Sequence, residues 1–112
     1  MKKYALITGS SSGIGLEIAK ILANKGYNII LTARRKERLI ENSKSIISSY
    51  NVSCDYISCD LSDKSSPNKI YDFCKKNNYD VEILVNNAGY AIPSSFIKTS
   101  MEDEEKFLRV LG

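Results

Sequence analysis

Three glycines near the start of the chain are spaced so that they could hold phosphate groups. They are Gly9, Gly13 and Gly15, in a segment (residues 8–15) that reads TGSSSGIG. The segment follows an apolar run and opens a stretch of helical spacing, the context in which such a loop binds a dinucleotide. Gly9 would allow the tight turn, Gly13 the approach of a pyrophosphate, and Gly15 close packing of helix on sheet. The helix N-terminus would add unpaired N–H groups and a partial positive charge.

The serines between these glycines could contribute as well. Ser10, Ser11 and Ser12 would offer hydroxyl donors to the same phosphates. A Walker-type ATP loop is excluded, because no Gly-Lys-Ser/Thr sequence ends the motif. The plain alternative is a glycine-rich turn that binds no ligand, and the predicted strand and helix on either side favour the binding interpretation.

Short apolar runs alternate with stretches of helical spacing along the chain. The runs predict four buried strands, at residues 4–8, 27–32, 52–59 and 81–85. This alternation is typical of βαβ units, so the predicted fold is α/β, a Rossmann-like, doubly wound parallel sheet. With four strands in the order 3-2-1-4 the sheet would be incomplete. The fourth strand would then be an apolar open edge, which favours self-association.

Helices are expected to cover both faces of this sheet. They would begin near Ile14 and end at Gly26, span residues 36–50, run from Pro67 to about residue 78, and span residues 101–111. The apolar residues that share a face in the first three are Ile14, Ile18, Ile21 and Leu22; Leu39, Ile46, Ile47 and Tyr50; and Ile70, Phe73 and Cys74.

Composition limits the class of protein. A chain of 112 residues predicts one domain, and a net charge of +3 is too small to imply a nucleic-acid partner. No apolar run approaches the roughly 20 residues that span a membrane. Cys54, Cys59 and Cys74 show no CxxC spacing, and the chain has no histidine. Reduced thiols in a cytoplasmic protein are therefore expected, rather than a disulfide or a metal site.

Two further segments complete a pattern that resembles a known family. Asp60 and Leu61 follow the third predicted strand, and residues 86–89, which read NNAG, follow the fourth. In this order and at this spacing, TGSSSGIG and NNAG resemble the N-terminal half of a classical short-chain dehydrogenase/reductase. The resemblance covers nearly the whole chain. Taken alone, NNAG could equally be an ordinary turn.

The resemblance implies a set of cofactor-binding residues. Those around the cofactor phosphates would be Gly9, Ser11, Ser12, Gly13, Ile14 and Gly15. Asp60 and Leu61 would meet the adenine ring. Asn87, Ala88 and Gly89 would line the cofactor and steady the central strands.

The residues after the second predicted strand bear on the choice of cofactor. Folds that prefer NAD carry an acid about 20 residues beyond the glycine loop, and Ala33 stands there in this chain. Arg34, Arg35, Lys36 and Arg38 follow. Cations at a helix N-terminus oppose its dipole by a few tenths of a kcal/mol each, so the cluster favours a bound anion. The 2′-phosphate of NADP would supply it through Arg34 and Arg35, which predicts NADP(H) over NAD(H); the alternative is a solvated basic helix start.

The family's activity, by resemblance, is hydride transfer between the nicotinamide and an alcohol or carbonyl substrate. A serine and a Tyr-xxx-Lys pair perform it, beyond the region matched here. The chain is therefore expected to be a dinucleotide-binding domain over residues 1–112, truncated before the C-terminal catalytic part, and no catalytic residue is assigned. Tyr71 and Lys75 have the Tyr-xxx-Lys spacing, but they precede NNAG in the chain. Their spacing is therefore interpreted as a coincidence. Leu111 stands where the family's asparagine is expected.

Two alternatives remain open from the sequence. The chain could be a non-catalytic NADP(H)-binding module that works with another subunit. It could equally be an inactive remnant of an enzyme.

Overall fold

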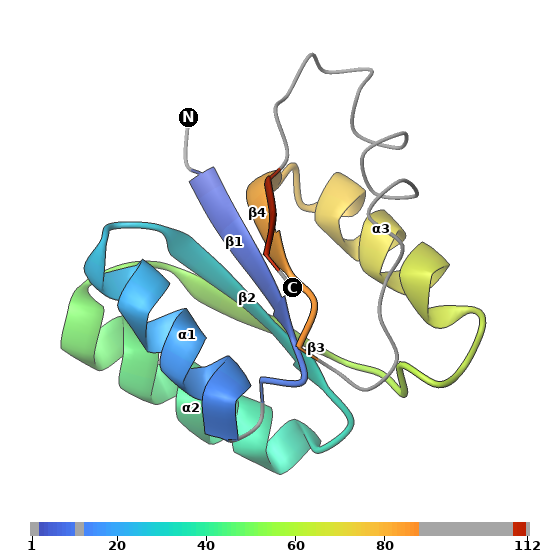
Figure 1. The fold of residues 1–112 in the computed structure, drawn as a ribbon, viewed down its shortest axis with the longest axis horizontal. Helices are drawn as coiled ribbons and strands as arrows, with labels where there is room; N and C mark the ends of the chain where they lie inside the picture. Colours follow the sequence, from blue (N-terminus) through green and yellow to red (C-terminus); the bar gives the residue numbers. More distant parts are fainter. Residues whose placement is uncertain (1–2, 11–12, 88–108, 112) are drawn as a thin grey trace.

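Parallel strands form a single five-stranded sheet in the computed structural model, which describes residues 3–10, 13–87 and 109–111 (Figure 1). The strands are β1 (Lys3–Thr8), β2 (Asn28–Ala33), β3 (Cys54–Ser58), β4 (Asp80–Val85) and β5 (Arg109–Leu111), in the order β3-β2-β1-β4-β5. The helices are α1 (Gly13–Asn24), α2 (Lys36–Tyr50) and α3 (Ser66–Lys76). The α/β, Rossmann-like fold and the order 3-2-1-4 of the first four strands are confirmed.

The fifth strand corrects two expectations. Residues 109–111 are a strand and not the end of a helix, and residues 101–108 lie outside the described part of the chain. β5 pairs in parallel with residues 83–85 of β4. β4 is therefore flanked on both sides, by β1 and β5, and the predicted four-stranded sheet with β4 as an open edge is wrong.

Two hydrophobic clusters lie on opposite faces of the sheet. Beneath α1 and α2, strand residues such as Ala5 and Ile7 pack with Ala19 and Leu39. On the other face, beneath α3, Leu6 packs among residues that include Ile70 and Cys74 (Figure 1). Because side chains alternate along a strand, each inner strand supplies both clusters, as a parallel sheet covered on both faces requires.

The pairing of β1 with β4 contains one irregularity. Tyr4 lies opposite Val81, but Ala5 lies opposite Ile83, so the register shifts at Glu82. Val81 consequently packs in the cluster beneath α3, whereas Ile83 packs in the cluster beneath α1 and α2.

The helices bury narrower faces than the sequence predicts. In α1 the residues against the sheet are mostly small, and Ile14 and Ile21 are 71% and 57% exposed. Their expected place on the buried face is therefore wrong. Ile47 of α2 is likewise 46% exposed, although Leu39 and Ile46 are buried as expected. The buried face of α1 is formed by Gly15, Ala19, Leu22 and Ala23.

Candidate functional site

The glycine-rich loop, residues 9–15, begins at the carboxyl end of β1 and includes the first residues of α1 (Figure 1). Gly9 and Gly13 have φ angles of +65° and +64°, in the left-handed region that favours glycine. Gly9 therefore makes the sharp turn off the strand that its position suggested. Gly13 is the first residue of α1, at the end where the backbone N–H groups lack intrahelical partners.

Gly13 and Gly15 face very different surroundings. A Cβ at Gly15 would lie 2.5 Å from the Gly9 carbonyl oxygen and 2.6 Å from Asn87 Nδ2, so only glycine allows α1 to approach this closely. A Cβ at Gly13 would meet no atom of the described residues within 4 Å. The loop is thus tight against the protein at Gly15 and open at Gly13. Ile14, between them, is exposed.

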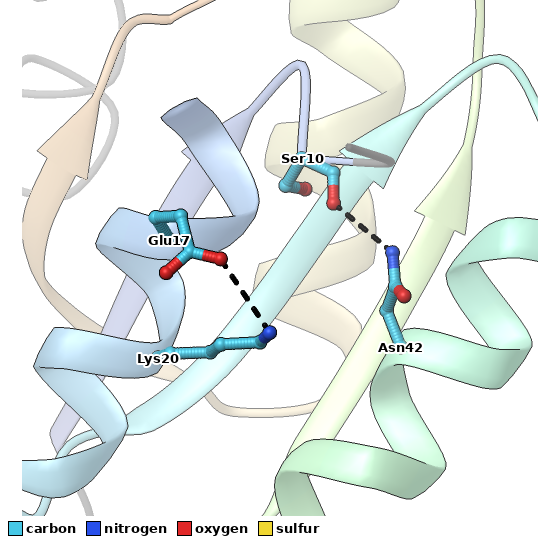
Figure 2. A network of polar contacts seen from close by, with 4 residues as sticks. All are labelled: Ser10, Glu17, Lys20 and Asn42. Carbon is cyan, nitrogen blue, oxygen red and sulfur yellow. Dashed lines mark hydrogen bonds and ion pairs between the residues drawn. The ribbon is translucent and has the colours of Figure 1, made fainter. Parts of the chain in front are cut away.

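Ser10 anchors the loop to the rest of the sheet. Its buried hydroxyl donates to the Ile7 carbonyl (3.0 Å) and accepts from the Thr32 backbone N–H (3.0 Å), and its own N–H donates to the Thr32 carbonyl. Asn42 of α2 donates from Nδ2 to the Ser10 carbonyl at 3.5 Å (Figure 2). The expectation that Ser10 offers its hydroxyl to a phosphate is therefore wrong. Ser11 and Ser12 lie outside the described residues.

Thr8 and Asn87 fasten the ends of β1 and β4 together, in what we call the Thr8–Asn87 clasp. The Thr8 hydroxyl donates to the Val85 carbonyl (3.2 Å) and accepts from the Asn87 backbone N–H (2.9 Å). Asn87 Nδ2 donates to the Gly9 carbonyl at 3.4 Å. Asn87 thereby joins the end of the fourth strand to the glycine-rich loop. Ala88 and Gly89 lie outside the described residues.

The basic cluster lies at the junction between β2 and α2. β2 ends at Ala33 and so has no acid at its end, and Ala33 itself is buried in the cluster beneath α1 and α2. Arg35 occupies the N-cap position with an extended backbone and makes no side-chain cap hydrogen bond. Glu37 in the first helical turn is an acid whose charge suits the helix dipole, a residue that the sequence reasoning left out. The exposed cations are Arg34, Arg35, Lys36 and Arg38.

Asp60 and Leu61 begin the loop between β3 and α3. The Asp60 carboxylate accepts hydrogen bonds from the Ser62 hydroxyl (2.6 Å) and backbone N–H (3.0 Å). These bonds, with a smaller contribution from the charge of Arg34, lower the pKa of Asp60. The Ser66 hydroxyl donates to the Asp60 carbonyl. Leu61 packs against the cluster beneath α3.

Tyr71 and Lys75 form a real pair at some distance from this site. Lys75 Nζ donates to the Tyr71 hydroxyl at 3.1 Å, on α3. That helix covers the face of the sheet opposite α1 (Figure 1). It also begins at the carboxyl ends of the strands and runs toward their amino ends, so the pair lies away from the edge that carries the glycine-rich loop.

Sequence reasoning missed three residues that shape the site. Thr8 precedes the first glycine and could have been noted for its hydroxyl. Thr32 and Asn42 carry no spacing signal, because their partner Ser10 lies 22 and 32 residues away in the sequence. Among the described residues, no helix is long and apolar enough to cross a membrane.

Comparison with known proteins places the site in a family context. The family model described as short chain dehydrogenase matches residues 3–111. A very-long-chain 3-oxoacyl-CoA reductase of Candida glabrata is 34% identical over 111 residues, which cover 96% of this chain and 31% of the reductase. The chain therefore spans less than a third of that curated relative's length.

Two solved structures of a reductase and a dehydrogenase are also similar to this chain. The L-sorbose reductase of Gluconobacter frateurii, complexed with NADPH and L-sorbose, is 38% identical with a TM-score of 0.75; the match covers 79% of this chain and 34% of the reductase. An alcohol dehydrogenase of Thermococcus sibiricus, complexed with 5-hydroxy-NADP, is 35% identical with a TM-score of 0.74, covering 80% of this chain and 38% of the dehydrogenase.

Proposed function

Because this chain belongs to the short-chain dehydrogenase/reductase family, we propose that residues 1–112 form the dinucleotide-binding part of an NADP(H)-dependent oxidoreductase. The reaction would be hydride transfer to or from an alcohol or carbonyl compound. The nicotinamide supplies or accepts the hydride when the cofactor is bound. No residue of this chain is assigned a catalytic role, and a cytoplasmic location stays a prediction.

The observation that carries the proposal is the pairing of two features at one edge of the sheet. The open side of Gly13 at the start of α1 leaves room for a pyrophosphate beside unpaired N–H groups. Exposed Arg34 and Arg35 follow the neighbouring strand β2, where a 2′-phosphate would need positive charge. The residues present therefore fit a phosphorylated dinucleotide.

The remaining residues would complete the binding site. Gly9 and Gly15 would shape the loop, and Ser11, Ser12 and Ile14 would surround the phosphates. Asn87 would hold the loop through the Gly9 carbonyl, with Ala88 and Gly89 lining the cofactor. Asp60 and Leu61 would lie beside the adenine ring.

The preference for NADP(H) is the part of the proposal that binding can test most directly. The complexes of the Gluconobacter reductase with NADPH and of the Thermococcus dehydrogenase with 5-hydroxy-NADP support it. One charge-assisted hydrogen bond contributes about 1.5–3 kcal/mol, so NADP⁺ should bind roughly ten- to hundredfold more tightly than NAD⁺. Isothermal titration calorimetry with both cofactors measures this ratio.

A charge reversal at Arg34 provides the matched test. Arg34→Asp should reduce or reverse the preference, because a carboxylate would face the 2′-phosphate. Lys44→Asp makes the same change of charge at an exposed position of α2 and should leave the preference intact. Equal affinities for the two cofactors in the unaltered chain, or an unchanged ratio in Arg34→Asp, would contradict the proposal.

A further inference from the structure

The ladder between β2 and β3 is extended by a side chain at the point where the basic cluster begins. The last backbone bond there joins the Cys59 N–H to the Ala33 carbonyl at 3.0 Å. One residue beyond the end of β2, the Ser58 hydroxyl donates to the Arg34 carbonyl at 2.9 Å. Ser58 is the last residue of β3 and is exposed.

The Arg34 carbonyl belongs to the peptide unit that joins Arg34 to Arg35. Fixing its oxygen restrains the orientation of that planar peptide, and with it the ψ of Arg34 and the φ of Arg35, on which the directions of the two side chains depend. Arg35 is in an extended conformation and lacks a side-chain cap bond. Its carbonyl accepts from the Leu39 N–H at 3.2 Å, so α2 holds the junction on one side and Ser58 holds it on the other.

From this geometry, we propose that Ser58 is a positioning residue for recognition of the 2′-phosphate. It acts through the peptide between Arg34 and Arg35 and donates no hydrogen bond to the cofactor itself. The inference rests on the proposed preference for NADP(H) and deepens it, because it names what orients the two arginines.

A nearby acid, Asp60, competes with a bound phosphate for the charge of Arg34. Asp60 lies two residues beyond Ser58 in the chain, and the charge of Arg34 acts on its carboxylate. A phosphate must therefore compete with Asp60 for the Arg34 side chain. A restrained backbone lowers the entropy that the two arginines lose when they bind an incoming phosphate, which favours the phosphate in that competition.

A pair of isosteric substitutions isolates the hydroxyl. Ser58→Thr keeps the donor, and Ser58→Val has nearly the same shape as threonine without it; both β-branched residues suit a strand. A neutral hydrogen bond of this kind corresponds to about a two- to tenfold effect. Ser58→Val is expected to lower the NADP⁺ to NAD⁺ affinity ratio by that factor through weaker NADP⁺ binding. Ser58→Thr should retain the ratio of the unaltered chain.

Calorimetric titration of both cofactors against each variant gives the readout. The ratio of NADP⁺ to NAD⁺ affinity does not change if Ser58 has only a structural role, because partial unfolding would weaken the binding of both cofactors by the same factor. If the unaltered chain prefers NADP⁺ and Ser58→Val keeps its full preference, the role of Ser58 is refuted while the proposed function stands. A fall of equal size in Ser58→Thr also refutes it. If the unaltered chain shows no preference, both proposals fail.

Discussion

Gly13 and Gly15 belong to the same motif but have different physical roles, which substitutions can distinguish. Gly15→Ala would press a methyl group against the Gly9 carbonyl oxygen and Asn87 Nδ2. We expect a loss of about 1–3 kcal/mol in the free energy of unfolding, because the backbone must move to relieve the contact. Urea unfolding followed by circular dichroism measures it.

Gly13 should behave in the opposite way. Its φ of +64° strains most side chains, and valine most of all, but asparagine tolerates this region. Gly13→Asn should therefore leave the free energy of unfolding nearly unchanged and weaken NADP⁺ and NAD⁺ alike, since its side chain would occupy the open side of the loop. Unchanged affinities in a folded Gly13→Asn variant would show that this side of the loop faces no ligand.

At the scale of the elements, one half-buried and one buried thiol, packed on different faces of the sheet, link stability to pH. Burial raises the pKa of Cys54, on β3, to about 11 and that of Cys74, on α3, to about 12, from a usual value of 9.0. The folded state therefore keeps protons that the unfolded chain releases. The stabilisation is complete below pH 9 and is lost as the pH rises from 9 through 11 and 12.

The pH prediction is testable with one variant. Cys74→Ala removes one of these groups, so its free energy of unfolding should fall less between pH 8 and pH 11 than that of the unaltered chain. The comparison uses slopes, because the smaller side chain also lowers stability at every pH. Cys54 contributes to the remaining slope, together with Tyr4 and Tyr79, whose pKa values burial also raises. An identical slope in the variant would contradict the assignment to Cys74.

The elements also show what could be predicted from the sequence and why. Continuous apolar runs predicted β1, β2 and β4 well, because parallel strands buried on both faces are short, continuous apolar runs, and these runs are too short to be helices. Periodicity could not say which side of α1 meets the sheet. The small residues Gly15 and Ala19 decide that by allowing close approach, which turns Ile14 outward. β5 has only three residues, and its pairing with β4 depends on tertiary contact.

The candidate site likewise contains residues that the sequence predicted and residues that it did not. The loop and Asn87 were found because a motif records them. The partners of Ser10 were missed, since hydrogen bonds between residues 22 or more apart leave no periodic trace.

At the scale of the whole molecule, the position of α3 places Tyr71 and Lys75 away from the glycine-rich loop. We expect the purified 112-residue chain to bind cofactor without measurable dehydrogenase or reductase turnover. General acid–base groups contribute about 10²–10⁴-fold, and Tyr71 and Lys75 lie on α3, on the face of the sheet opposite α1. NADPH oxidation assays with ketones, aldehydes and quinones test this. Activity that disappears in Tyr71→Phe would instead make this pair catalytic.

The Thr8–Asn87 clasp also imposes an order in time. Its two residues are separated by 79 positions, so a chain emerging from the ribosome completes β1 and the glycine-rich loop long before Asn87 is available to hold them. Until β4 docks beside β1, the Gly9 carbonyl has no amide partner from Asn87. We therefore expect the glycine-rich loop to reach its final geometry only after β4 has docked, and a bound dinucleotide would stabilise the completed fold over its precursors.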